Sequence, residues 1–275
     1  DLLVEEADAF VRAHAMDPFL LVFATPVPHL ALQVPADSVA EYDGAFPETP
    51  YAGGRGYLAH PTPRAAYAAM ITRMDRDVGR LLDTLDELGI ADDTLVLFTS
   101  DNGPSWTGGC DLEFFEGGGG LRGRKAQLYE AGIRVPLIAS WPGRVPPGSV
   151  SWHVSAFWDL MPTCLEAAGA AIPADIDGIS LMPGLTGESA QPTHEALYWE
   201  HAQSWQAVRW GDWKAVRKSQ GAPLEIYDLA TDAGETHDLA GTRPDLLERA
   251  EALMATSRTP SDLYPLKQPV QAEPR

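Results

Sequence analysis

The sequence predicts an α/β fold in which helices flank a largely parallel sheet, together with a small C-terminal antiparallel sheet that carries a helix. Three patterns support this prediction. Two continuous apolar runs, at 19–24 and 94–99, have the length and composition of buried parallel strands. Between them, residues 64–88 have the spacing of a long amphipathic helix. Beyond residue 190 the segments become short and alternate between apolar and polar side chains, as antiparallel strands do.

The first elements are separated by clear stop signals. The chain opens into what we expect to be a helix, and the run at 19–24 ends at Thr25-Pro-Val-Pro28. Residues 36–63 are rich in proline, glycine and tyrosine, which favours a long loop. The helix at 64–88 stops before Gly89, because glycine readily adopts the left-handed conformation that closes helices.

The next segments continue the alternation of strands and helices. We expect a short helix at 124–132, a strand at 135–140 and a helix at 156–169 that again closes on a glycine. This order of elements is typical of an α/β domain with a largely parallel sheet.

The last third of the chain predicts a unit of its own. We therefore divide the chain into an α/β part, residues 1–190, and a small C-terminal subdomain, residues 191–275. In the subdomain, a helix at about 244–257 is expected to cover one face of an antiparallel sheet, and water the other face. The four expected strands lie at 196–200, 206–210, 213–217 and 224–228.

Composition excludes several classes of protein. The 275 residues include 39 acidic residues and 20 lysines or arginines, so the net charge is −19. A chain this acidic is unsuited to a broad nucleic-acid surface, which needs positive charge. No apolar run approaches the ~20 residues of a membrane span. Two cysteines do not make a disulfide framework.

Asp101 and Asn102 are the first candidate site residues, because they directly follow the apolar run at 94–99. In open α/β sheets, ligands bind at the carboxyl ends of the strands. Carboxylate and amide oxygens suit hard cations such as calcium. Asp-Asn-Gly is also a common turn sequence, and on this tripeptide alone the turn is the better interpretation. A calcium ion would in addition need ~6–8 oxygen ligands, more than this pair supplies.

A basic segment follows the Asp-Asn pair. Residues 121–150 hold five cations and one acid, Glu130, so their net charge is 5 − 1 = +4 and that of the remaining chain is −19 − 4 = −23. Such a segment favours an anion pocket, with Arg122 and Lys125 as candidates for binding the substrate. A solvated face with local ion pairs is an equally good interpretation. The five cations are Arg122, Arg124, Lys125, Arg134 and Arg144.

Two histidines are further candidates. His29 follows the apolar run at 19–24 by way of Thr25-Pro-Val-Pro28, so it is expected at the same sheet edge as Asp101. There it would bind an oxyanion or transfer a proton. His201 ends an expected strand within Trp199-Glu-His201, and we include it as a candidate for binding substrate. A histidine taken alone is more often a satisfied polar group than a functional one.

Taken in order, these segments resemble the sulfatase family of the alkaline-phosphatase-like superfamily, over residues 19–257. The most specific block comprises Phe98-Thr-Ser-Asp-Asn-Gly-Pro104, Leu121-Arg-Gly-Arg-Lys125, Tyr129-Glu-Ala-Gly-Ile-Arg-Val-Pro136 and Trp141-Pro-Gly143. Further matches are Asp159-Leu-Met-Pro-Thr163, Tyr198-Trp-Glu-His201, Trp210-Gly-Asp-Trp-Lys214, Tyr227-Asp-Leu229 and Glu235-Thr-His-Asp-Leu239.

The resemblance implies a role for each matched residue. Asp101 and Asn102 match two calcium ligands of the family. Lys125 matches a lysine that contacts the sulfate group, and His29 matches a histidine that reaches the sulfate and protonates the leaving oxygen. We therefore expect Lys125 and His29 to be catalytic, with a small-molecule or carbohydrate sulfate ester as substrate. Stabilising the charge that moves onto sulfate oxygens would be their shared task.

Two departures from the family pattern concern single residues. Ala131 stands where the family usually has glycine, and its methyl group is tolerable unless the position needs a positive φ. Cys110 stands where related bacterial sequences often have histidine, so substrate specificity is expected to differ if that position touches the substrate.

A larger departure is that the family's nucleophile motif is absent. Sulfatases carry Cys-x-Pro-Ser-Arg or Ser-x-Pro-x-Arg, whose first residue is oxidised to formylglycine, and an Asp-Asp pair that completes the calcium shell. Neither Cys110 nor Cys164 fits this motif. Ser140-Trp-Pro-Gly-Arg144 matches it literally but follows the Asp-Asn pair instead of preceding it, and its Trp-Pro-Gly matches the turn after a core strand.

We therefore expect a C-terminal portion of a sulfatase, with the formylglycine nucleophile and half of the calcium site in a preceding segment. The first residue is Asp1, which agrees with this expectation. The chain alone is then expected to be inactive. Two alternatives stay open: a phosphomonoester or phosphonate hydrolase of the same superfamily, and a pseudoenzyme or binding module without a nucleophile. A periplasmic or secreted location fits the resemblance.

Overall fold

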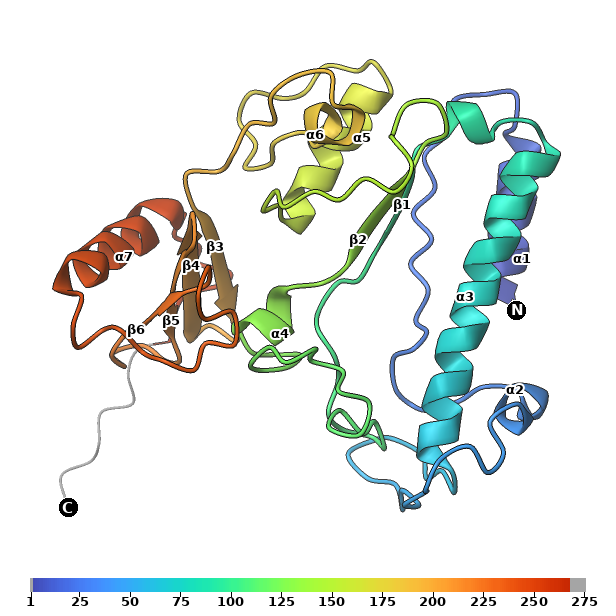
Figure 1. Cartoon of the computed structure of the whole chain (residues 1–275), viewed down its shortest axis with the longest axis horizontal. Coiled ribbons are helices and arrows are strands. Elements are labelled where there is room, and N and C mark those ends of the chain that lie inside the picture. The colour runs from blue at the N-terminus through green and yellow to red at the C-terminus, as the bar shows by residue number, and fades with distance from the viewer. Residues whose placement is uncertain (1, 268–275) are drawn as a thin grey trace.

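The structure is a computed structural model that describes residues 2–267 (Figure 1). It has three parts along its longest axis: the α1–α3 helix pair, a central two-stranded sheet with α5 and α6 near it, and a four-stranded sheet with α7. None of the helices within residues 2–267 is long and apolar enough to cross a bilayer.

The longest helix is α3, Pro63–Glu87, and it confirms the helix expected at 64–88. A proline occupies its first turn, where the missing N–H has no partner to lose. Its buried residues lie on one stripe and include Ala66 and Met70. The N-terminal helix α1, Leu2–Ala13, packs along it (Figure 1), and a short helix α2, Ala36–Ala40, lies within the segment expected to be a loop.

The prediction of a largely parallel sheet is wrong for the described residues. Strands β1, Val96–Thr99, and β2, Leu137–Ser140, form a two-stranded antiparallel sheet in which Val96 faces Ser140. The 3-10 turn η1, Ala91–Asp93, precedes β1. Both expected strands exist, but the chain between them reverses direction instead of crossing over, so they pair antiparallel.

The strand expected at 19–24 is also absent. The segment is extended, and its backbone makes two local hydrogen bonds, from Ala24 to Val22 and from Thr25 to Phe23. The side chains of Leu20 and Val22 are 68% and 77% exposed. The apolar composition predicts a strand, but a strand needs a neighbour to pair with, and residues 2–267 provide none here.

Shorter helices occupy the connections. The helix expected at 124–132 is reduced to α4, Glu130–Ile133, because residues 122–129 form turns. The helix expected at 156–169 is confirmed as the 3-10 turn η2, Phe157–Asp159, followed by α5, Leu160–Ala167. A further helix, α6, Met182–Thr186, packs against α5.

The C-terminal sheet confirms the expected antiparallel meander. Its four strands are neighbours in sequence order, β3, Leu197–His201, β4, Trp205–Trp210, β5, Trp213–Arg217, and β6, Glu225–Asp228. Helix α7, Pro244–Ser257, covers one face (Figure 1) and forms a core with the strands. That core comprises Val208, Trp210, Ala215, Leu224, Ile226, Leu246, Ala250 and Met254.

The other face of this sheet was expected to be solvated, and that expectation is wrong. Leu128 and Tyr129, from the segment just before α4, pack onto it against Ala207, Val216 and Tyr227. The basic segment is thus in direct contact with the C-terminal sheet. Alternation in the strands could not show this, because small or aromatic residues on a face are compatible with either water or a packed neighbour.

Candidate functional site

The Asp101-Asn102 pair lies in the turn that follows β1. The Ser100 hydroxyl donates to the Asn102 carbonyl oxygen at 2.9 Å, and the Asn102 amide nitrogen donates to the Gly103 carbonyl oxygen at 2.9 Å. This arrangement leaves the Asn102 Oδ1 atom without a hydrogen-bond donor within residues 2–267. The Asp101 side chain is exposed and has no ion pair among the described residues. The tripeptide forms a turn, and this turn also presents side-chain oxygens that are free to bind a metal ion.

Lys125 is joined to this turn by its backbone. Its N–H donates to the Pro104 carbonyl oxygen at 2.9 Å, and the Gly103 N–H donates to the Gly132 carbonyl oxygen at 3.0 Å. The segment 125–132 is thus hydrogen-bonded to the two residues that directly follow the Asp101-Asn102 pair. The structure brings these three candidates onto adjoining segments.

The two loops approach so closely that only glycine fits at the contact. A Cβ atom on Gly103 would lie 1.7 Å from the Ala131 carbonyl oxygen, where the two segments meet. Within the segment of Lys125 itself, a Cβ atom on Gly132 would lie 2.0 Å from the Gln127 carbonyl oxygen. Ala131, in contrast, sits inside α4 with a negative φ, so its methyl group is accommodated as expected.

Four of the five cations in the basic segment have a partner. Arg122 contacts Tyr227 and Tyr129, Arg124 stacks over Trp106 with its guanidinium carbon 4.5 Å from the ring centroid, and the remaining two pair with Glu130 and Trp141. Lys125 is the one cation of the segment whose ammonium group contacts no acid or aromatic ring of the described chain. Most cations of the segment are thus paired within the fold, and anion binding by Lys125 stays a prediction.

His29 has its tautomer set by its neighbour. The ring Nδ1 lies 2.7 Å from the Leu30 carbonyl oxygen, and because a carbonyl only accepts, Nδ1 carries the proton. The exposed Nε2 is then the basic nitrogen. The Leu30 side chain packs against Gly108, where an added Cβ would lie 2.6 Å from Leu30 Cδ1. His29 is thereby tied to the loop that follows Asp101-Asn102.

Arg122 and His201 are placed by the C-terminal sheet. The Arg122 guanidinium donates to the Tyr227 hydroxyl at 2.7 Å and to the Glu235 carbonyl oxygen at 2.9 Å. His201 ends β3 opposite Trp205, whose ring meets the Tyr129 ring edge-on at 5.8 Å between centroids. Substrate binding by either residue stays a prediction.

The residues that sequence reasoning considered as nucleophiles occupy unsuitable positions. Cys110 is buried beside α3, and this burial raises the pKa of its thiol to about 11, so it is protonated at neutral pH. Burial also raises the pKa of Cys164. Ser140 is the last residue of β2, and Trp141 after it donates from Nε1 to the Asp92 carbonyl oxygen at 2.8 Å. That contact is structural, which agrees with the rejection of the Ser140 motif.

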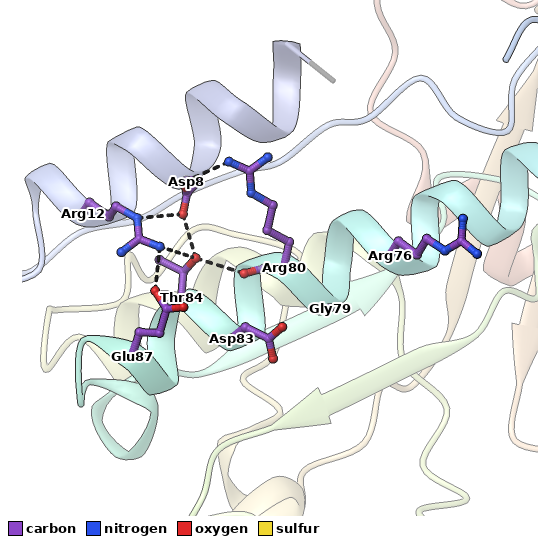
Figure 2. A pocket seen from close by; sticks show the side chains of 8 residues that line it. All are labelled: Asp8, Arg12, Arg76, Gly79, Arg80, Asp83, Thr84 and Glu87. Atoms are coloured by element: carbon purple, nitrogen blue, oxygen red, sulfur yellow. Dashed lines mark hydrogen bonds and ion pairs between the residues drawn. The ribbon is translucent and has the colours of Figure 1, made fainter. Parts of the chain in front are cut away.

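A polar groove of about 490 Å³ lies elsewhere, between α1 and α3 (Figure 2). Its charges compensate one another: Arg12 pairs with Asp8 at 3.1 Å and with Glu87 at 2.8 Å, and Arg80 pairs with Asp8 at 3.1 Å. A hydrogen bond from Thr84, with both arginines, lowers the pKa of Asp8. We assign this groove to helix packing. Its lining residues are Asp8, Arg12, Arg76, Gly79, Arg80, Asp83, Thr84 and Glu87.

The Asp101-Asn102 pair has the donor chemistry of a partial calcium site. Asp101 and Asn102 offer free carboxylate and amide oxygens, which are the donors that calcium prefers. Within residues 2–267, no cluster of three or more His, Cys, Asp or Glu side chains is arranged to hold a metal. The pair therefore fits part of a calcium shell of ~6–8 oxygens and leaves the rest to other ligands.

Comparison with known protein families shows to which of them the chain belongs. The family model described as Sulfatase matches residues 1–170, which include the His29 loop, the Asp101-Asn102 turn and Lys125. This chain belongs to the sulfatase family. A second model, described as N-sulphoglucosamine sulphohydrolase, C-terminal, matches residues 123–254 and so covers the loop of Lys125 together with the C-terminal sheet and helix.

Individual sulfatases show the same relationship. The chain is 36% identical over 221 residues to steryl-sulfatase of Mus musculus, covering 79% of this chain and 32% of that protein. It is 31% identical over 275 residues to N-acetylgalactosamine-6-sulfatase of Canis lupus familiaris, covering 96% and 47%. The crystal structure of Ps i-CgsB in complex with k-i-k-neocarrahexaose superposes with a TM-score of 0.77 at 27% identity, covering 94% and 54%. The chain thus spans about a third to a half of the length of these three proteins.

Proposed function

We propose that this chain supplies the calcium-binding Asp101-Asn102 pair and the sulfate-binding Lys125 of an enzyme that hydrolyses sulfate esters. The observation that carries the proposal is the direct backbone connection between the two: Lys125 N–H to Pro104, and Gly103 N–H to Gly132. Within a family of sulfatases, two free oxygens beside an unpaired ammonium group suit a metal ion and an anionic ester bound side by side.

The side chains of this chain would divide the work on the sulfate group. Lys125 would bind its oxygens and stabilise the charge that builds on them as the ester bond breaks. His29, with its Nδ1 proton held by Leu30, would use Nε2 to hold and deliver a proton to the leaving oxygen. Calcium, when bound at Asp101 and Asn102, would supply a positive charge that polarises the sulfate.

We infer that the nucleophile belongs to a segment preceding residue 1. No cysteine or serine of this chain combines the family motif with a suitable position, and a formylglycine would therefore come from elsewhere. The open edge of β1 and the exposed apolar side chains of Leu20 and Val22 favour additional strands beside them. On this proposal the chain alone is inactive, and residues 1–190 complete a catalytic domain to which residues 191–275 attach.

The substrate class we propose is a small-molecule or carbohydrate sulfate ester. Among the relatives, N-acetylgalactosamine-6-sulfatase is named for a sulfated sugar, and steryl-sulfatase for a small molecule. The Ps i-CgsB structure holds a neocarrahexaose.

The proposal is tested by measuring sulfate and phosphate release by the whole protein as the calcium concentration is varied. We expect sulfate release that is lost on chelation, and Asp101→Ala should raise the calcium concentration for half-maximal rate about 10-fold or more. Asp93→Ala removes an exposed carboxylate from the 3-10 turn η1, which precedes β1, and should change nothing. Release of phosphate without sulfate, or the same calcium response in Asp101→Ala, would contradict the proposal.

A further inference from the structure

Glu235 is buried in a conformation that non-glycine residues rarely adopt. Its φ is +52°, in the left-handed region, and its side chain is fully buried. It lies in the loop between β6 and α7. Strain of this kind persists only where the surrounding contacts enforce it, so those contacts show what the residue does.

The contacts of Glu235 reach both ends of the loop that carries Lys125. Its carbonyl oxygen accepts a hydrogen bond from Arg122 Nη1 at 2.9 Å, three residues before Lys125. Its Oε2 atom accepts one from the Glu130 N–H at 2.7 Å, five residues after Lys125. The two ends are also joined to each other, since the Ala131 N–H donates to the Arg122 carbonyl oxygen at 2.8 Å. A single residue of the C-terminal subdomain thus holds a closed loop at its base.

A buried lysine completes this attachment. Lys214 of β5 places its Nζ atom 2.9 Å from Glu130 Oε1 and 2.9 Å from Glu235 Oε1. All three side chains are at most 2% exposed. Arg209 and Arg134 each lie 3.8 Å from Glu130 Oε2 and balance the remaining negative charge.

The chemistry of this group argues for positioning and against a purely stabilising role. Buried ion pairs lose their hydration, and well-packed apolar residues in their place are often as stable or more so. A buried ion group instead favours one arrangement of the segments that carry it, because each charge needs an opposite charge or a hydrogen-bond partner close by. Burial raises the pKa of Glu235, and the neighbouring Lys214 ammonium group opposes that rise.

We propose that Glu235 is a positioning residue that holds Lys125 in place for binding the sulfate group, with Lys214 and Glu130 as its partners. The inference rests on the proposed function of Lys125. The C-terminal subdomain would therefore contribute to the active site without touching substrate. Glu235 fixes the base of the loop, and the middle of the loop is held by the hydrogen bond from the Lys125 N–H to the Pro104 carbonyl oxygen.

Amide hydrogen exchange of the whole protein tests the positioning directly. In Glu235→Gln, an uncharged side chain faces both Lys214 and the Glu130 N–H, so residues 122–131 should exchange at least 10-fold faster while β4 and β5 stay protected. Arg122→Gln removes the hydrogen bond to the Glu235 carbonyl oxygen and disturbs the buried charges less. It should also speed hydrogen exchange in residues 122–131. Glu248→Gln, the same change on an exposed position of α7, should alter nothing. Unchanged exchange in the loop, or equal acceleration in the sheet, would overturn the proposal.

A double-mutant cycle on the rate of sulfate release separates this inference from the proposed function. Glu235→Gln should lower kcat/KM about 10–100-fold when Lys125 is present and have little effect in Lys125→Ala, because it acts through that lysine. An equal loss in both backgrounds would overturn the positioning role and leave the proposed function standing. A rate unaffected by Lys125→Ala would instead overturn the proposed function, while the exchange experiment would still decide whether Glu235 holds the loop.

Discussion

Replacing Lys125 with alanine is expected to lower kcat for sulfate ester hydrolysis by the whole protein about 10²–10³-fold. Removing one preorganised group that stabilises developing negative charge typically costs this much. Lys125 is the cation of the basic segment that the described chain leaves without an acidic or aromatic partner, so its loss is not made good by a neighbour. Steady-state rates on an aryl sulfate measure the effect, with KM recorded alongside.

A charge-conserving variant and a control variant accompany Lys125→Ala. Lys125→Arg keeps the charge and should retain more activity than Lys125→Ala, although the broader guanidinium has different geometry. Lys267→Ala removes an exposed lysine at the end of the described chain and should leave the rate unchanged. A rate within twofold of wild type in Lys125→Ala would remove this residue from the site.

Replacing Gly103 with alanine is expected to destabilise the protein by about 3 kcal/mol or more, because over-packing against immovable atoms is at the costly end of such changes. The new Cβ would lie 1.7 Å from the Ala131 carbonyl oxygen, which belongs to the backbone of α4 and cannot rotate aside. The hydrogen bond from Gly103 to Gly132 would have to break. Urea denaturation measures the free energy of unfolding, and the Lys125 loop should also lose its protection from hydrogen exchange.

Gly79→Ala is the matched control, because it makes the same change in an open place. Gly79 lies inside α3 and nothing lies within 4 Å of the position of an added Cβ. Alanine favours a helix over glycine by roughly 0.5–1 kcal/mol, so this variant should be slightly more stable than wild type. If Gly103→Ala were as stable as wild type, the close approach of the two loops would be wrong.

Local patterns in the sequence predicted the elements that depend on local signals. The helix at 63–87 and the four C-terminal strands follow from side-chain spacing, with proline and glycine marking several of the ends. The direction of β1 and β2 does not follow in the same way, because pairing depends on chain segments that lie between and beside them. Residues 19–24 make the same point: they have a strand's composition, yet their backbone forms only local hydrogen bonds.

The candidate site was predicted in part. Asp101, Asn102 and Lys125 lie on adjoining segments, and their roles in binding calcium and sulfate, which rest on family motifs and on a basic segment after a strand, stay predictions. Arg122 was grouped with Lys125 by charge alone, whereas its guanidinium is bound by Tyr227 and Glu235. Charge in a sequence does not reveal which cations already have partners in the fold.

The group around Glu235 was missed altogether. Lys214 and Glu235 were noted only as parts of family motifs. Their contacts with Glu130 join residues that are 84 and 105 positions apart in the sequence, and such contacts leave no local pattern. The sequence held one signal. Glu130 is the single acid of the basic segment, and an acid surrounded by cations in the sequence is a candidate for an ion pair. The left-handed φ of Glu235 has no counterpart in the sequence.

A crystal structure of the whole protein with calcium and inorganic sulfate tests the central claim most directly. The account predicts a calcium ion about 2.3–2.6 Å from oxygens of Asp101 and Asn102, the distance range of protein calcium sites. It also predicts a sulfate within hydrogen-bonding distance of Lys125 Nζ and His29 Nε2. Calcium bound without Asp101 and Asn102, or sulfate bound at a site that Lys125 does not reach, would contradict it.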